Sequence, residues 1–192
     1  MTRYPLTVDR RALVAAIGAI ALFAAIEIAW GRPPLCPCGH IALWAGDPNS
    51  PENSQQLSDW YSLSHIIHGF LFYGLLWSIL PGRLRLWALP LAVMIEGGWE
   101  LLENSPIIID RYRAGTIAVG YSGDSILNSM SDIVMMTIGF AIARRLPVWG
   151  TVALAIFFEL LALAVIRDNL TLNVLMLTHP IDAIRVWQAG GA

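Results

Sequence analysis

The stretch "AVMIEGGWELLENSPIIID", residues 92–110, decides the fold class and raises the functional question. Most of it is apolar enough for a membrane helix, yet it carries Glu96, Glu100 and Glu103. A carboxylate in hydrocarbon is strongly unfavourable unless it is paired, protonated or hydrated. Because the three glutamates are spaced i, i+4 and i+7, they share one face of a helix. We therefore expect this face to be turned away from lipid.

The rest of the chain is similarly apolar. Of its 192 residues, 56% are hydrophobic and 14% are charged, whereas soluble domains carry roughly 25% charged residues. The net charge of -2 gives no basic footprint for nucleic acid. The composition predicts an all-α, multi-pass membrane protein with one integral membrane domain over residues 1–192.

Five segments are long enough to cross a bilayer as helices. They are residues 12–31, 60–80, 86–104, 125–143 and 147–166. The tail after residue 166 is apolar but is interrupted by Asp168, Asn169, Asn173 and Pro180. We expect this tail to lie on the membrane interface, anchored by Trp187, rather than to form a sixth span. The predicted fold is a five-helix transmembrane bundle.

Arginine placement predicts the orientation, because cytoplasmic loops of membrane proteins are enriched in basic residues. One side would hold a tail and two short loops with Arg3, Arg10, Arg11, Arg83, Arg85, Arg144 and Arg145. The other side would hold Arg32, Arg111, Arg113, Arg167 and Arg185, spread over longer segments. We expect the N-terminus inside, the long loops in the periplasm, and the protein in a bacterial inner membrane.

Two more polar stripes match the glutamate stripe. Tyr61, His65 and His68 are spaced i, i+4, i+7, and Asp124, Asn128 and Asp132 are spaced i, i+4, i+8. At a helical rise of about 1.5 Å per residue, the deepest groups lie at one depth, roughly 12 Å inside the outer boundary. These groups are His68, Glu96, Asp132 and Glu159. The common depth predicts one polar cavity that opens to the periplasm.

Three kinds of chemistry fit such a cavity. A divalent metal, with zinc favoured, would take nitrogen and oxygen ligands from His65, His68, Glu96, Glu100, Glu103, Asp124, Asn128 and Asp132. Metal-free acid–base catalysis would use carboxyl groups that share a proton, with a histidine as partner. Proton-coupled transport is the least favoured, because five helices without a repeat suit alternating access poorly. Buried polar pairs can also simply lock helices together.

Two outer motifs carry further chemistry. "LCPCGH" supplies Cys36, Cys38 and His40, and a disulfide, a metal site and two unlinked thiols all remain open. "DRYRAG" supplies Arg111 and Arg113. These two can bind an anionic head group or phosphate at the cavity mouth, or can extend toward lipid phosphates without a specific ligand.

Several stretches resemble a known family. They are "CPCGH", "NSQQLSDWYSLSHIIHGFLFY", "EGGWELLENSPIIIDRYR", "GYSGDSILNSMSDIVMMTIGF" and "IRDNLTLNVLML". The chain resembles, from about residue 30 to 188, a family of alphaproteobacterial membrane proteins of unknown function. Its motif order is also similar to that of the VanZ-like proteins, which are linked to glycopeptide tolerance at the cell envelope. That similarity implies functional roles for His68, Glu100, Asp124, Asn128 and Asp132, although "CPCGH" has no counterpart there.

We therefore expect a metal-assisted enzyme that acts on a membrane lipid or another envelope component. Glu100, Asp132 and His68 are the expected catalytic residues. The alternative is a non-enzymatic role, either as a ligand-binding protein or as an accessory subunit of a membrane complex.

Overall fold

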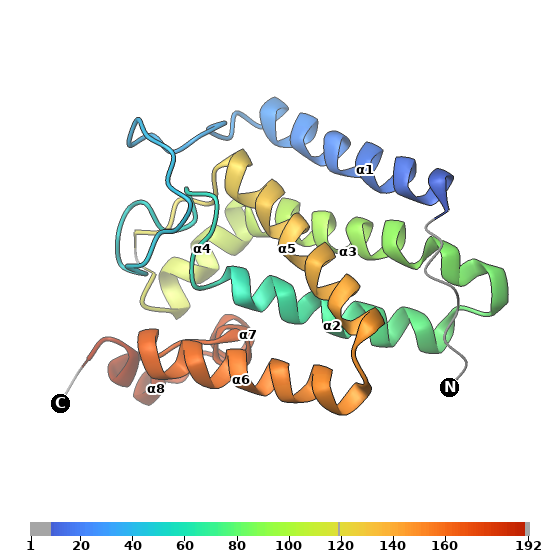
Figure 1. The fold of residues 1–192 in the computed structure, drawn as a ribbon. Coiled ribbons are helices and arrows are strands. Elements are labelled where there is room, and N and C mark those ends of the chain that lie inside the picture. Colours follow the sequence, from blue (N-terminus) through green and yellow to red (C-terminus); the bar gives the residue numbers. More distant parts are fainter. Residues whose placement is uncertain (1–8, 119, 191–192) are drawn as a thin grey trace.

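The computed structural model describes residues 9–118 and 120–190, and within them the regular structure is entirely helical. The long helices are α1 (Arg10–Ala29), α2 (Ser62–Ile79), α3 (Ala88–Glu103), α5 (Ile126–Arg145) and α6 (Val148–Ile166). The short ones are the 3₁₀ helix η1 (Gly82–Trp87), α4 (Pro106–Gly115), α7 (Leu170–Thr178) and α8 (Asp182–Gln188). Figure 1 shows the long helices side by side, with the longer connections and the short helices α4, α7 and α8 at one end.

Each predicted span overlaps one of the five long helices, with bounds that differ by at most two residues. Four of these, α1, α2, α5 and α6, are long and apolar enough to cross a membrane. Helix α3 has 16 residues, fewer than the roughly 20 that a bilayer requires. The prediction of an all-helical protein with several membrane-length helices is confirmed, whereas α3 does not qualify as a span by its own length.

Helices α2 and α5 approach each other closely because glycines lie at their contact. A Cβ atom added to Gly69 would lie 2.1 Å from the carbonyl oxygen of Met136. One added to Gly139 would lie 2.0 Å from that of Ile66. Small residues at such crossings let helix backbones meet in apolar surroundings, where the hydrophobic effect does not drive association. This contact brings the histidine stripe of α2 against the aspartate stripe of α5.

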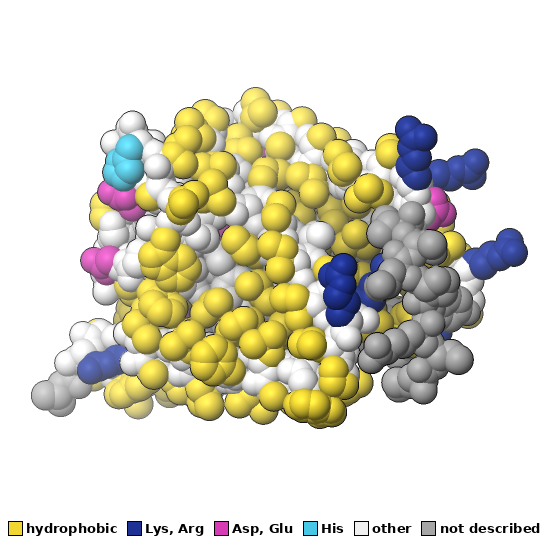
Figure 2. Space-filling view, viewed as in Figure 1, with side chains coloured by type: hydrophobic (Ala, Val, Ile, Leu, Met, Phe, Trp, Pro, Cys, Tyr) yellow, Lys and Arg dark blue, Asp and Glu magenta, His cyan; other side chains and the backbone are white. Residues whose placement is uncertain are grey.

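The apolar core lies between α1, α2, α3 and α5, while large apolar side chains remain exposed on the outside. Ile133 and Met136 are fully buried on α5, whereas Val148, Trp149 and Ile156 of α6 are more than half exposed. Figure 2 shows apolar side chains over most of one face, with most of the visible arginines gathered at the end that carries the N-terminus. This surface suits a lipid environment.

The segment before α2 folds over the start of α5. The backbone amides of Ser125, Ile126 and Leu127 donate to the carbonyls of Ser54, Pro33 and Pro34 at 3.1, 2.9 and 3.2 Å. These bonds satisfy amides that a helix N-terminus leaves without intrahelical partners. The guanidinium of Arg32 also donates to the carbonyls of Ser122, at 2.8 Å, and Asp124. Residues 32–59 thereby form a roof over the polar end of the bundle.

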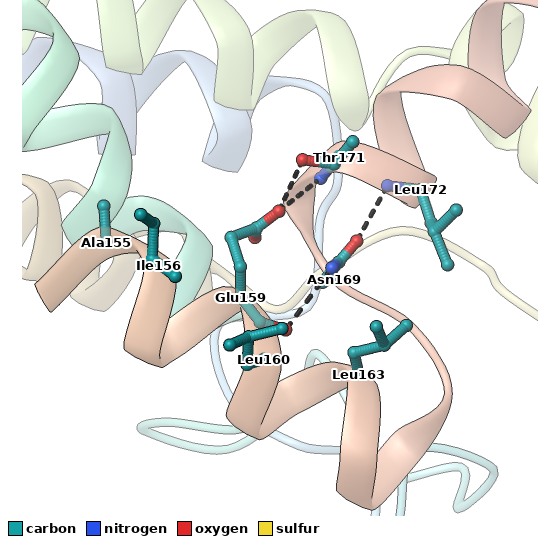
Figure 3. Close-up of a pocket in the computed structure, with 8 residues that line it drawn as sticks. All are labelled: Ala155, Ile156, Glu159, Leu160, Leu163, Asn169, Thr171 and Leu172. Carbon is teal, nitrogen blue, oxygen red and sulfur yellow. Dashed lines mark hydrogen bonds between the residues drawn. The ribbon is translucent and has the colours of Figure 1, made fainter. Parts of the chain in front are cut away.

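The C-terminal tail forms α7 and α8 in place of a sixth span, as predicted. Glu159 of α6 is central to this junction (Figure 3) and lies there rather than among the cavity carboxylates. Its carboxylate accepts hydrogen bonds from the amides of Leu170 and Thr171, at 2.9 and 3.0 Å, and from the Thr171 hydroxyl at 2.5 Å. Glu159 therefore does not belong to the cavity, although the sequence places it at the same depth as Glu96 and Asp132. Its position follows from its role at the N-terminus of α7, which its side chain caps.

Candidate functional site

A cavity of about 700 Å³ lies under the roof, between α2, α3, α5 and the tail. Its wall includes residues from 48–55 and from 120–124 at the polar end. Titratable side chains from six parts of the chain contribute to the wall, namely Asp59, Tyr61, His65, His68, Glu96, Glu103, Tyr112, Tyr121, Asp124, Asp132 and Asp168. The three polar stripes predicted from the sequence therefore meet around one space.

Two imidazoles converge on one carboxylate at the deep end of this cavity. Nδ1 of His65 lies 2.6 Å from Oε1 of Glu96, and Nδ1 of His68 lies 3.0 Å from the same oxygen. The two rings meet edge to face, with centroids 5.2 Å apart. The spacing of three residues on α2 places both rings on the face that meets α3, where Glu96 is fully buried.

His65 also lies close to two further carboxylates. Its Nδ1 is 3.6 Å from Oε1 of Glu100, and its Nε2 is 3.7 Å from Oδ2 of Asp132. Asp132 accepts a hydrogen bond from the Ser62 hydroxyl at 3.2 Å. Among the described residues, neither carboxylate oxygen of Glu100 has a hydrogen-bond partner, although the side chain is 0% exposed. The site therefore contains buried carboxylate oxygens that its hydrogen bonds do not satisfy.

A second group of carboxylates lies nearer the roof. One oxygen each from Glu100, Glu103 and Asp124 lies within 4.8 Å of the others. Asp124 accepts a hydrogen bond from the Tyr121 hydroxyl at 2.9 Å and from Nδ2 of Asn104 at 3.3 Å. Burial raises the pKa of Asp124 to about 6, and the Tyr121 hydrogen bond opposes that shift. Such a group can bind a cation or hold protons near neutral pH.

The structure brings the eight predicted metal ligands into one neighbourhood. Glu100 contacts His65, and the other seven line the cavity: His65, His68, Glu96, Glu103, Asp124, Asn128 and Asp132. The side-chain amide of Asn128 already donates to the carbonyl of Gln56 at 2.9 Å. Its carbonyl oxygen is thus the atom that can serve as a ligand.

Arg111 and Arg113, which the sequence predicts to bind an anionic group at the cavity mouth, donate to backbone carbonyls in the structure, and that role stays a prediction. Arg111 donates to the carbonyls of Leu177 and Thr178 at 2.6 and 3.1 Å, and Arg113 donates to the carbonyl of Tyr121 at 2.6 Å. Neither belongs to the part of the cavity wall that the structure describes. The reason is local, since Arg111 satisfies carbonyls at the C-terminus of α7 that have no helical partner.

Sequence reasoning missed several polar groups of the wall. Asp59 is buried and accepts from the amides of Ser54 and Tyr61 at 2.9 and 2.8 Å. Its burial raises its pKa, against those hydrogen bonds. The available signal was its position three residues before the start of α2, which is typical of a residue that organises a helix N-terminus.

Asp168 ties the tail to the cavity wall. It accepts hydrogen bonds from the Tyr61 hydroxyl at 3.1 Å and from Nε2 of Gln188 at 3.0 Å. Burial raises the pKa of Asp168 to about 6, although its hydrogen bonds, including one from the amide of Asn169, oppose the shift. The start of α2, the α6–α7 junction and α8 therefore meet at one carboxyl group.

Comparison with known proteins identifies the family. The sequence model of a family described as "Protein of unknown function (DUF2585)" matches residues 27–190. The chain belongs to this family. The predicted membership in an alphaproteobacterial family of unknown function is confirmed, while the similarity to VanZ-like proteins stays a prediction.

Relatives named "UPF0314 protein" match this chain over almost its whole length. The protein from Sphingopyxis alaskensis is 60% identical over 186 residues, which cover 96% of this chain and 98% of the relative. The one from Novosphingobium aromaticivorans is 58% identical over 191 residues, 95% of each chain. The one from Rhizobium johnstonii is 58% identical over 177 residues, 92% of this chain and 91% of the relative. No solved structure matches the chain.

Proposed function

We propose that the protein is an enzyme of the bacterial inner membrane, with its N-terminus inside and its cavity facing the periplasm. Most of the visible arginines lie at the end of the molecule opposite the longer connections and α4, α7 and α8 (Figures 1 and 2), as the positive-inside rule requires for this orientation. Helices α1, α2, α3, α5 and α6 would be the spans. Helix η1 leads directly into α3, and residues 86–103, which follow Arg83 and Arg85, would extend about 27 Å at roughly 1.5 Å per residue, close to the ~30 Å hydrocarbon core.

We further propose that the deep end of the cavity binds one divalent cation, with zinc favoured. The observation that carries this proposal is the convergence of His65, His68 and Glu96, whose nearest nitrogen–oxygen distances are 2.6 and 3.0 Å. Ligands at 2.0–2.1 Å from a tetrahedral zinc are roughly 3.3 Å apart, so a small outward movement would make room for the ion. A cation would also offset the excess of buried carboxylates around His65.

In this proposal each of three side chains, Asp132, Glu100 and His68, has a separate role in hydrolysis. The bound cation would polarise an ester or phosphate oxygen, or activate water. Asp132 lines the cavity and is oriented by Ser62, so it is placed to accept a proton from the attacking water. Glu100 contacts His65 and would hold that ring in position. His68 is the more exposed of the two imidazoles and would face the substrate.

The cavity wall favours an amphiphilic substrate, either a lipid or a lipid-linked envelope component. Beside the polar residues near the roof, the wall includes Phe72, Ile95 and Trp99. Ile95 is 43% exposed on the outer surface of α3, a surface that would face the acyl chains. A polar head group would therefore lie near His68 while its acyl chain remains in the bilayer between α2 and α3.

Two measurements test the proposed function. Elemental analysis of the purified, oxidised protein should give close to one zinc per chain, which a His65→Ala, His68→Ala double variant should lose while His179→Ala keeps it. The protein should also convert a component of vesicles made from total envelope lipid, as detected by mass spectrometry, and Asp132→Asn should abolish this conversion.

The results also separate the alternatives. Conversion that persists in metal-free protein after chelation would replace the metal by acid–base catalysis through Glu100 and Asp132. A lipid that copurifies unchanged, with no conversion by the wild-type protein, would favour the ligand-binding role.

A further inference from the structure

The "CPCGH" motif lies outside the cavity and has no part in the proposed function. In the structure the sulfurs of Cys36 and Cys38 form a disulfide, so the first of the three alternatives is the one observed. Cys36 is buried, whereas Cys38 and His40 are exposed. The bond can therefore be reached by a reductant from the Cys38 side.

Two further metal ligands stand beside this disulfide. The sulfur of Cys38, a ring nitrogen of His40 and a carboxylate oxygen of Glu52 all lie within 4.8 Å of one another. Nε2 of His40 is 3.2 Å from Oε2 of Glu52, close to the roughly 3.3 Å that separates nitrogen and oxygen ligands of a tetrahedral zinc. The backbone turns at Gly39, where φ is +84°, a conformation that glycine adopts readily. Because of this turn, the side chains of Cys38 and His40 can point toward the same place, although the two residues are separated by only one position.

The side chain of Gln56 orients Cys38 and Glu52 through hydrogen bonds. Its side-chain oxygen accepts a hydrogen bond from the amide of Ala42 at 2.7 Å, which fixes the direction of the side-chain amide. Its Nε2 then donates to Oε2 of Glu52 at 3.0 Å and to the sulfur of Cys38 at 3.3 Å. Outer groups of this kind hold metal ligands in place, and Gln56 is itself only 1% exposed.

We propose that reduction of the Cys36–Cys38 disulfide creates a metal site for a zinc-like divalent cation, with Cys36, Cys38, His40 and Glu52 as ligands. A dithiol supplies two electrons and two protons: its own sulfurs become joined, and Cys36 and Cys38 become thiols. Binding of the cation then displaces the two thiol protons, because the thiolate is the ligand form. Two sulfurs, one nitrogen and one oxygen would supply the four ligands of a tetrahedral zinc site.

The site is part of the roof, and this gives it a consequence for the cavity. The carbonyl of Gln56 accepts the hydrogen bond from Asn128 on α5, and its side chain contacts both Cys38 and Glu52. Residues 48–51 and 53–55, on both sides of Glu52, line the cavity. Exchange of the disulfide for a metal centre would therefore act directly on the loop that covers the cavity.

Cobalt(II) is a selective probe of this site. The chain contains only two cysteines, so a thiolate-to-cobalt charge-transfer band can arise from no other position. The full-length protein in detergent is reduced with a water-soluble phosphine, freed of the reagent under argon and titrated with Co²⁺. We expect the band to saturate at one equivalent in reduced protein and to be absent from oxidised protein. Both His40→Ala and Glu52→Gln should weaken Co²⁺ binding at least about tenfold, the smallest effect usual even for an outer-shell partner.

Two controls make the outcome decisive. His179→Ala removes an exposed histidine elsewhere and should leave the band and affinity unchanged. The His65→Ala, His68→Ala variant should also retain the band, so failure of the cavity metal would not affect this proposal. A reduced protein without the band would overturn the proposal. So would a band whose affinity is the same in wild type, His40→Ala and Glu52→Gln, because the two thiols alone would then bind cobalt.

Discussion

Replacement of Glu100 by glutamine should stabilise the metal-free protein. Oxygens of Glu103 and Asp124 lie within 4.8 Å of an oxygen of Glu100, and at an effective dielectric constant of 20 each ionised pair repels by at least about 3.5 kcal/mol. Nδ1 of His65 lies 3.6 Å from Oε1 of Glu100, so a protonated His65 attracts the Glu100 carboxylate by about 4.6 kcal/mol at the same dielectric constant. When Glu103 and Asp124 are both ionised, the balance opposes a charge on Glu100 by roughly 2 kcal/mol, and the desolvation of Glu100 acts in the same direction.

The assay is thermal unfolding in detergent, followed by tryptophan fluorescence after exhaustive chelation. A gain of roughly 2 kcal/mol corresponds to an increase in Tm of about 4–8 °C for a chain of this size. In metal-loaded protein the cation offsets the repulsion, so the same substitution should lose that gain.

A matched control is Glu159→Gln, because Glu159 accepts hydrogen bonds from two backbone amides and one hydroxyl. It should lower Tm with and without metal, since an amide offers a single acceptor oxygen. A fall in Tm for Glu100→Gln after chelation would refute the reasoning, because it would mean that the fold depends on the Glu100 charge.

Three other predictions concern topology, pH and packing. In spheroplasts, a membrane-impermeant thiol reagent should label Cys36 and Cys38 after mild reduction, and labelling only after lysis would reverse the proposed orientation. Burial favours protonated Asp168, with a pKa of about 6 against the ordinary 3.8 of an aspartate. The stability that this group contributes is therefore full below pH 4 and is lost as pH rises through 6. Relative to Asp168→Asn, the wild type should lose on the order of 3 kcal/mol between pH 4 and 7, and parallel Tm curves would contradict this. Gly139→Ala should lower Tm by several degrees because its Cβ meets a carbonyl, whereas Gly74→Ala, with nothing within 4 Å, should leave Tm unchanged or raise it.

The helices and the inward stripes could be predicted from the sequence because both follow from local rules. Length and hydropathy place the five long helices to within a few residues, since apolar runs end where polar turns begin. The direction of Glu96, His65 and Asp132 follows from the high free energy of charge in lipid. No knowledge of long-range contacts was needed for either result.

The contacts that hold the roof and the tail against the bundle could not be predicted, because they depend on partners far away in the chain. Ser125 donates to a carbonyl at residue 54, and Arg111 donates to one at residue 177. Every residue has a backbone carbonyl, so the sequence does not indicate which carbonyl will accept a given hydrogen bond. Glu159 illustrates the same point, because its role appears only once α7 begins eleven residues later.

The contacts around His65 argue against a simple lock between helices. A protonated imidazole has two N–H donors, and the geometry directs one toward Glu96, at 2.6 Å, and the other toward Asp132, at 3.7 Å. Glu100 is left over, and within the described part of the chain both its oxygens are buried without a hydrogen bond. A lock would be more stable with an apolar residue at that position. Proteins retain such unfavourable groups mainly at functional sites, so the surplus carboxylate is the feature that most strongly favours a chemical role for this cavity.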